Sequence, residues 1–105
     1  MSAVVYEVTL HVQAGIADEY AGWLRGHVRE MLGLPGFLDA SVARQREPAP
    51  ADGEVVFCCR YRLVDAGALQ AYLREHAPRM RADGVARFGE RFRASRRVLD
   101  ELPGY

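Results

Sequence analysis

The spacing of apolar residues constrains this chain most, because it changes along the sequence between two periods. Four segments alternate apolar and polar side chains, as strands do: Val4–Val12, Phe37–Arg44, Glu54–Leu63 and Arg91–Leu99. Two other segments place apolar residues three and four positions apart, as amphipathic helices do: Ile16–Leu32 and Asp65–Met80. The resulting order of strands and helices is that of a ferredoxin-like βαββαβ fold. We therefore expect an α+β fold in one domain over residues 1–105, with a four-stranded antiparallel sheet and both helices on one face.

Residues with special backbone preferences indicate where the second helix begins, breaks and ends. Asp65 is expected to cap its start, because an aspartate side chain accepts hydrogen bonds from the first free backbone N–H groups. Pro78 has no N–H to donate, so we expect a kink or a new helical turn there. Asp83-Gly84 and Gly89 are expected to lead the chain out of the helix.

The alternation also assigns each strand residue to one of the two faces of the sheet. The more apolar set is expected to face the helices: Tyr6, Val8, Leu10, Leu38, Ala40, Val42, Phe57, Cys59, Tyr61, Phe92, Ala94 and Val98. The opposite set mixes apolar and charged side chains: Val5, Glu7, Thr9, His11, Phe37, Asp39, Ser41, Val56, Cys58, Arg60, Arg62, Arg93, Ser95 and Leu99.

The mixed face is informative because its charged residues fall near the middle of the sheet. The first and third strands are central in this fold, so Glu7, His11 and Arg60 should cluster. A carboxylate at that place needs a cationic partner, which Arg60 or Arg93 would supply. Two interpretations stay open: an ordinary solvent-facing sheet, or a sheet that stacks on a second sheet and leaves a polar cavity between them.

The composition limits which classes of binding partner and which cellular compartment we expect. The 14 basic and 14 acidic residues give a formal net charge of zero, which argues against nucleic acid as a partner. All the basic residues are arginine, so Schiff-base chemistry on lysine is excluded. The adjacent Cys58 and Cys59 would point to opposite faces of a strand, which disfavours a disulfide and suits a reducing cytosol. No apolar run reaches the length of a membrane span and no signal-peptide pattern is seen, so we expect a cytoplasmic protein without a membrane partner.

Three histidines and one tryptophan are the other candidates for chemistry. The spacing of His11, His27 and His76 is not that of metal ligands, so we expect no metal site. His11 points to the mixed face near the end of a central strand and could reach a ligand there. His27 lies one helical turn from Trp23 and is either a ligand-binding residue or general base, or a packed histidine with a backbone partner. Trp23 serves either the core or recognition.

Several motifs carry a resemblance to a known family: Tyr6–Val8, Trp23–Arg25 with His27, Tyr72–Pro78, Arg81 and Arg91–Arg97. The chain resembles an uncharacterised bacterial family within the dimeric α/β-barrel superfamily, which is ferredoxin-like and similar to antibiotic-biosynthesis monooxygenases. The resemblance implies two subunits whose sheets stack face to face, with a ligand cavity in each subunit. It also implies kinship in fold with cofactor-free oxygenases, haem-binding barrels and small isomerases. Haem degradation in such barrels relies on an asparagine, and this chain has none.

Two functions follow as hypotheses. In the first, a homodimer binds an aromatic or carboxylate-bearing compound between sheet and helices, as a cofactor-independent oxygenase- or isomerase-like enzyme. We expect no cofactor, and the ligand-binding residues would be Glu7, His11, Arg60, Arg93, His27 and Trp23. In the second, the same charges only set the register of a non-catalytic structural or regulatory dimerisation module.

Overall fold

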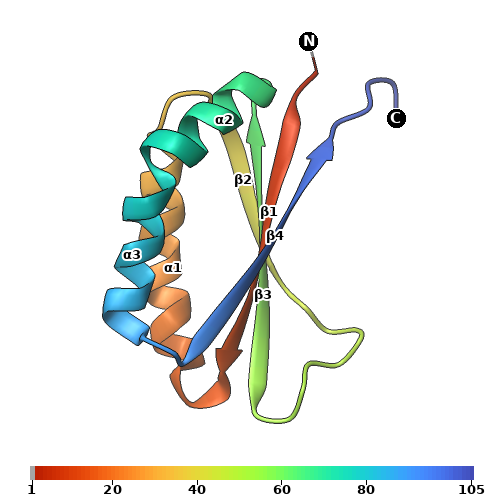
Figure 1. Ribbon diagram of the computed structural model, residues 1–105. Coiled ribbons are helices and arrows are strands. Elements are labelled where there is room, and N and C mark those ends of the chain that lie inside the picture. The colour runs from red at the N-terminus through yellow and green to blue at the C-terminus, as the bar shows by residue number, and fades with distance from the viewer. Residues whose placement is uncertain (1) are drawn as a thin grey trace.

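The sheet has four antiparallel strands, which a computed structural model describes together with the rest of residues 2–105. They are β1 (Val4–Gln13), β2 (Phe37–Arg44), β3 (Glu54–Leu63) and β4 (Phe92–Asp100). Their order in the sheet is β2-β3-β1-β4, so the first and third strands are central, as the sequence predicts (Figure 1). The predicted α+β fold with βαββαβ order is confirmed, apart from a break that divides the second helix in two.

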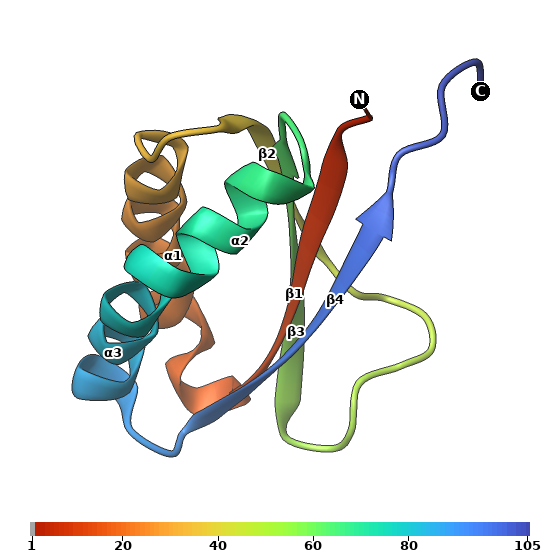
Figure 2. The same ribbon diagram turned by 45° about the horizontal axis from the view of Figure 1, so that its top comes forward.

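The helices all lie on one side of the sheet (Figures 1 and 2). A short 3-10 helix, η1 (Ala14–Ile16), leads into α1 (Ala17–Leu32), and α2 (Ala66–Glu75) is followed directly by α3 (Ala77–Phe88). The Asp65 side chain caps α2 by accepting a 2.8 Å hydrogen bond from the Ala68 N–H. Pro78 lies in the first turn of α3, so the predicted new helical turn is confirmed.

The end of α3 differs from the prediction. Asp83 and Gly84 lie inside the helix, which continues to Phe88 and ends at Gly89 with a positive φ of 59°. Gly84 is there for a packing reason, because a Cβ atom at this position would lie 3.1 Å from Trp23 and 3.3 Å from Phe92. The glycine therefore lets α3 approach the tryptophan of α1 closely.

The hydrophobic core fills the space between the helices and the sheet. The sheet contributes Tyr6, Tyr61 and Leu63, each at most 3% exposed, and the helices contribute Tyr20, Met31, Leu69, Tyr72, Met80 and Phe88. The two cysteines are free and lie on opposite faces, with Cys59 in the core and Cys58 on the other side. The alternation of β1 and β3 thus specifies the core correctly.

Two predicted face assignments in β2 are wrong. Phe37 faces the helices, where its ring lies 5.8 Å from Tyr61 and 5.2 Å from Tyr72. Leu38 is 51% exposed instead of buried. The cause is an irregularity in register between Phe37 and Asp39, which shifts the alternation by one residue at the start of the strand.

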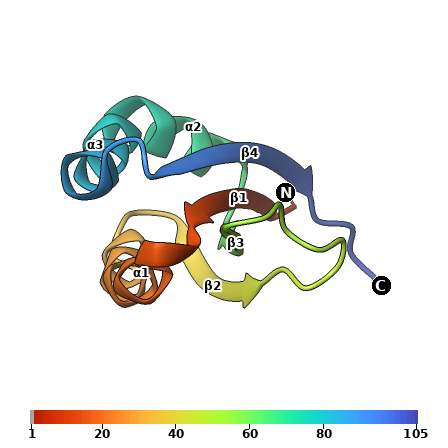
Figure 3. The same ribbon diagram turned by 90° about the horizontal axis from the view of Figure 1, so that it is seen from below.

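The opposite face of the sheet, which we call the open face, carries no helix in the described part of the chain (Figure 3). The loop between β2 and β3 and the C-terminal tail extend on this side (Figure 2). Val56 points to the open face and is nevertheless only 1% exposed. Stacking of two such sheets stays a prediction. None of the helices within residues 2–105 is long and apolar enough to cross a membrane.

Candidate functional site

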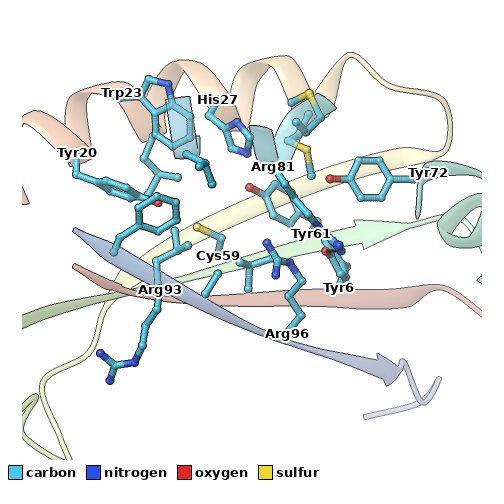
Figure 4. A pocket seen from close by; sticks show the side chains of 18 of the residues that line it. Tyr6, Tyr20, Trp23, His27, Cys59, Tyr61, Tyr72, Arg81, Arg93 and Arg96 are labelled. Atoms are coloured by element: carbon cyan, nitrogen blue, oxygen red, sulfur yellow. Dashed lines mark hydrogen bonds between the residues drawn. The ribbon is translucent and has the colours of Figure 1, made fainter. Parts of the chain in front are cut away.

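A cavity of about 330 Å³ lies between the sheet and helices α1 and α3, and we call it the helix-side pocket (Figure 4). This volume is at the small end of the roughly 300–1,000 Å³ range of ligand pockets and suits a molecule of one or two rings. Most of its wall is apolar or aromatic: Val8, Leu10, Tyr20, Trp23, Leu24, Met31, Met80, Val85, Phe92 and Ala94.

Aromatic rings form one wall of the pocket. Tyr20 lies at the centre of this group, with ring centroids 5.4 Å from Trp23, 4.8 Å from Phe88 and 5.2 Å from Phe92. Helical spacing places Tyr20 and Trp23 on the same side of α1, and the register of the sheet brings Phe92 beside Val12 at the matching end of β4. Such a wall favours a flat aromatic ligand.

His27 also lines the pocket, one helical turn beyond Trp23. Its ring stacks on that indole at a centroid distance of 4.7 Å and an angle of 23°. Its Nδ1 atom is buried and has no hydrogen-bond partner within residues 2–105, so the expectation of a backbone partner at that atom is wrong. Burial lowers the pKa of His27 and the charges of Glu30 and Asp83 oppose this only in part, so the imidazole is neutral at neutral pH.

Arginines and tyrosine hydroxyls provide the other polar groups of the pocket. Arg81 of α3 and Arg96 of β4 both line it, and Arg81 Nη2 donates a 3.1 Å hydrogen bond to the Tyr6 hydroxyl. Burial raises the pKa of Tyr72 to about 12 and that of Cys59 to about 12. These groups therefore keep their protons at neutral pH and stay hydrogen-bond donors.

The centre of the open face holds a carboxylate between two arginines. Glu7 is 7% exposed, and its Oε2 and Oε1 atoms accept hydrogen bonds from Arg60 Nε at 2.8 Å and Arg97 Nε at 2.6 Å. The three residues are direct cross-strand neighbours, because Glu7 is paired in register with both arginines. The hydrogen bond from Arg97 is the main reason why the pKa of Glu7 is lowered, and Arg60 adds to it.

A second ion pair lies toward one end of the same face. Arg93 bonds both carboxylate oxygens of Glu54, and His11 Nδ1 lies 3.9 Å from that carboxylate. The main effect on Glu54 is the hydrogen bond from Arg93, which lowers its pKa. Within residues 2–105, no three His, Cys, Asp or Glu side chains gather as a metal ion would require.

The sheet therefore divides the predicted site residues into two groups. Trp23, His27 and part of the Arg93 side chain line the helix-side pocket. The guanidinium group of Arg93 points away from the pocket (Figure 4) to Glu54, and Glu7, His11 and Arg60 lie on the open face. The idea that all six serve one cavity between sheet and helices is wrong, because residues of opposite parity in a strand cannot share a face. The predicted pairing of Glu7 with Arg60 is confirmed, but its second partner is Arg97 and not Arg93.

Sequence reasoning missed Arg81 and Arg96 as site residues. The alternation of β4 contains a signal for Arg96, because it shares parity with Phe92, Ala94 and Val98 and so faces the helices. Arg81 follows Met80 at the edge of the apolar stripe of α3, where sequence spacing does not separate a pocket residue from a solvated one.

Comparisons with known proteins agree with this fold. A Nitrosomonas europaea protein of unknown function superposes with a TM-score of 0.72 at 15% identity, covering 100% of this chain and 94% of that one. A variant of SnoaB, a cofactor-independent oxygenase from Streptomyces nogalater, superposes with a TM-score of 0.70 at 13% identity. The match covers 100% of this chain and 97% of that one. A candidate antibiotic-biosynthesis monooxygenase from Bacillus cereus superposes with a TM-score of 0.69 at 14% identity, and the match covers 100% of this chain and 98% of that one.

These identities show the fold alone, and no curated protein matches the sequence. A family model matches residues 3–102, which is nearly the whole chain. The chain thus belongs to the family described as domain of unknown function DUF4286, and it has the ferredoxin-like fold of these solved structures.

Proposed function

We propose that this protein binds a small aromatic or carboxylate-bearing molecule in the helix-side pocket and acts on it as an oxygenase- or isomerase-like enzyme without a cofactor. The observation that carries the proposal is a mostly apolar pocket of about 330 Å³ with a few polar groups, among them a histidine whose Nδ1 has no hydrogen-bond partner within residues 2–105. This is the usual construction of a small-molecule site. Solved structures of the same fold include a cofactor-independent oxygenase, which supports the class of reaction by analogy.

His27 is the group suited to chemistry. Among the described lining residues it is the one whose residue type exchanges a proton near neutral pH, because tyrosine, cysteine and arginine titrate higher. As a neutral imidazole it can accept a proton from an acidic C–H or O–H group of a bound molecule. An isomerase would return that proton to another atom of the same molecule, whereas an oxygenase would let the resulting carbanion react with dioxygen.

Ligand binding can be located with the single tryptophan of the chain. In a proton–nitrogen NMR spectrum Trp23 gives one indole N–H signal, and we expect addition of 2-naphthoate to shift it. Ala94→Phe fills the pocket and should abolish the shift, whereas Ala86→Phe on the exposed side of α3 should leave it unchanged. An indole signal that stays unmoved in the wild type at millimolar 2-naphthoate, 2-naphthamide and 2-naphthol would contradict the proposal.

A second candidate function rests on the open face. Glu7 is buried between two arginines near the middle of the open face, which is the arrangement expected if a second copy of the chain packs there and paired charges set its register. On this view the protein is a homodimer that serves as a structural or regulatory module. Sedimentation velocity should then show a dimer at micromolar concentration, and a dimer that survives the double change Glu7→Leu/Arg60→Leu without altering growth or metabolites would favour this function over the enzymatic one. A monomer at all concentrations would exclude it.

A further inference from the structure

One end of the helix-side pocket carries positive charge that no acidic side chain neutralises. Arg81 and Arg96 line the pocket, and neither takes part in any ion pair found within residues 2–105. The described lining contains no aspartate and no glutamate. Because His27 is neutral at neutral pH, the pocket has a net positive charge before a ligand enters.

The two arginines come from different elements and both line the pocket. Arg96 is paired in register with Val8, so it projects to the helix face of β4 between Ala94 and Val98, where the pattern otherwise places apolar residues. Arg81 of α3 bonds the hydroxyl of Tyr6, which lies two positions from Val8 on the same face of β1. Burial raises the pKa of Tyr72 and Tyr6 adds to this, while the charges of Arg81, Arg96 and Arg79 lower it.

Tyr6 adds a third polar group beside these arginines. Its side chain is 3% exposed, and its hydroxyl accepts the hydrogen bond from Arg81 Nη2. The hydroxyl proton itself is therefore free to be donated to another acceptor. Two guanidinium groups and one hydroxyl donor next to an aromatic wall are the groups that recognise a carboxylate on a ring.

We propose that the ligand of this pocket is an aromatic carboxylate, whose acid group is bound by Arg81, Arg96 and the Tyr6 hydroxyl while its ring lies against Trp23 and Tyr20. This inference rests on the proposed function and narrows it from a small molecule to an aromatic acid.

The other arginines of the region do not compete for this role. Arg93 also lines the pocket with part of its side chain, but its guanidinium group is bonded to Glu54 on the open face, and Arg97 is bonded to Glu7. Arg79 of α3 pairs with Glu30 outside the pocket at 3.2 Å. Guanidinium groups that already have carboxylate partners gain less from an incoming anion than Arg81 and Arg96 do.

The test compares two molecules of the same shape and different charge. Calorimetric titration of the full chain with 2-naphthoate and with neutral 2-naphthamide should show about 10- to 100-fold tighter binding of the acid. The double variant Arg81→Gln/Arg96→Gln should lose this preference while still binding the amide. Arg74→Gln/Arg87→Gln removes two exposed arginines that do not line the pocket, and should retain the preference. The Trp23 indole signal reports in each case whether the ligand occupies the pocket.

The outcomes separate this inference from the proposed function. If both molecules shift the Trp23 signal and bind the wild type equally, the aromatic-acid inference is wrong and the small-molecule pocket stands. If the preference for the acid survives in Arg81→Gln/Arg96→Gln, the acid group is bound elsewhere and the inference fails as well. If neither molecule binds, both proposals are overturned. Tyr6→Phe should weaken the binding of 2-naphthoate by a few-fold and leave the affinity for 2-naphthamide unchanged. This comparison tests the role of the Tyr6 hydroxyl as the third hydrogen-bond donor.

Discussion

The two faces of the sheet differ in whether their charged side chains have partners of opposite charge. On the open face, Glu7 and Glu54 each accept hydrogen bonds from arginine, and Arg62 bonds both Asp39 and Glu101. In the helix-side pocket, the exposed side chains of Arg81 and Arg96 line a mostly apolar space and have no acidic partner in the described chain. Paired charges of the first kind are satisfied by the fold itself. Unpaired charges beside a cavity remain available to a ligand, which is why we place the candidate site on the helix side.

The largest expected difference between the two faces is in stability. Leu63 is fully buried on the helix face, and Leu63→Ala should lower the free energy of unfolding by about 2–5 kcal/mol through lost burial and a cavity. Leu99 lies partly exposed on the open face, so Leu99→Ala should cost about 1 kcal/mol or less in a monomer. Urea unfolding followed by circular dichroism measures both. A larger and concentration-dependent loss in Leu99→Ala would show that a second copy covers the open face.

The central ion cluster gives the next effect and a dependence on pH. Glu7→Gln should cost about 2 kcal/mol at pH 7, because two charge-assisted hydrogen bonds are lost at a buried position. The pKa of Glu7 is lowered in the folded protein, so its contribution is complete above the ordinary pKa of 4.5 and is lost as the pH falls through the lowered value. The gap between wild type and Glu7→Gln should therefore narrow below about pH 4.5, as seen in urea midpoints from pH 7 to pH 3. A gap that stays constant over this range would mean that the ion pairs contribute nothing to stability.

A pair of glycine variants tests how tightly the helix side is packed. Gly84→Ala should cost about 1 kcal/mol, because the new methyl group meets Trp23 at 3.1 Å and Phe92 at 3.3 Å. Gly22→Ala on α1 meets nothing within 4 Å and should stabilise by about 0.5–1 kcal/mol through helix propensity. Thermal unfolding gives the stability, and the emission maximum of Trp23 should move only in Gly84→Ala. Two stabilised variants with unchanged emission would contradict the close approach of α1 and α3.

The smallest effect is expected at the exposed rim of the open face. Asp39 pairs with Arg62 at 2.6 Å, but both side chains are exposed and Arg62 keeps Glu101 as a second partner. Asp39→Asn should therefore change stability by less than about 0.5 kcal/mol, and added salt should remove even this difference. A loss comparable to that of Glu7→Gln would show that the rim is covered in solution.

The sequence predicts much of the fold because the strands and helices follow their periods closely. Both central strands, the cap at Asp65 and the break at Pro78 need only local information. The start of β2 cannot be predicted in this way, because the irregular register between Phe37 and Asp39 is not visible in the alternation of apolar and polar residues. Gly84 looks like a helix end, and only the packing of Trp23 against it explains why the helix continues.

The site was less predictable than the fold. Charged residues in the middle of a sheet attract attention, yet Glu7 and Arg60 are neutralised by their neighbours in register. Arg96 faces the helices at a position that its own alternation indicates, but the sequence does not show which of the four arginines between Arg91 and Arg97 bind a carboxylate. Sequence shows which face a residue occupies. It does not show which partner reaches that residue from another element.

The neighbouring positions Tyr6 and Glu7 on β1 have a consequence for how such a chain can diverge. One side chain reaches the pocket and the next one holds the ion cluster on the opposite face. A slip of β1 by one residue in its pairing with β3 and β4 would exchange the two, placing a carboxylate in the core and a phenol among the arginines. Changes of chain length are therefore barred from β1, whereas the loop between β2 and β3 is free to accept them. Ligand preference in this fold therefore has to change by substitution of side chains at fixed positions, while the register of β1 stays the same in every variant.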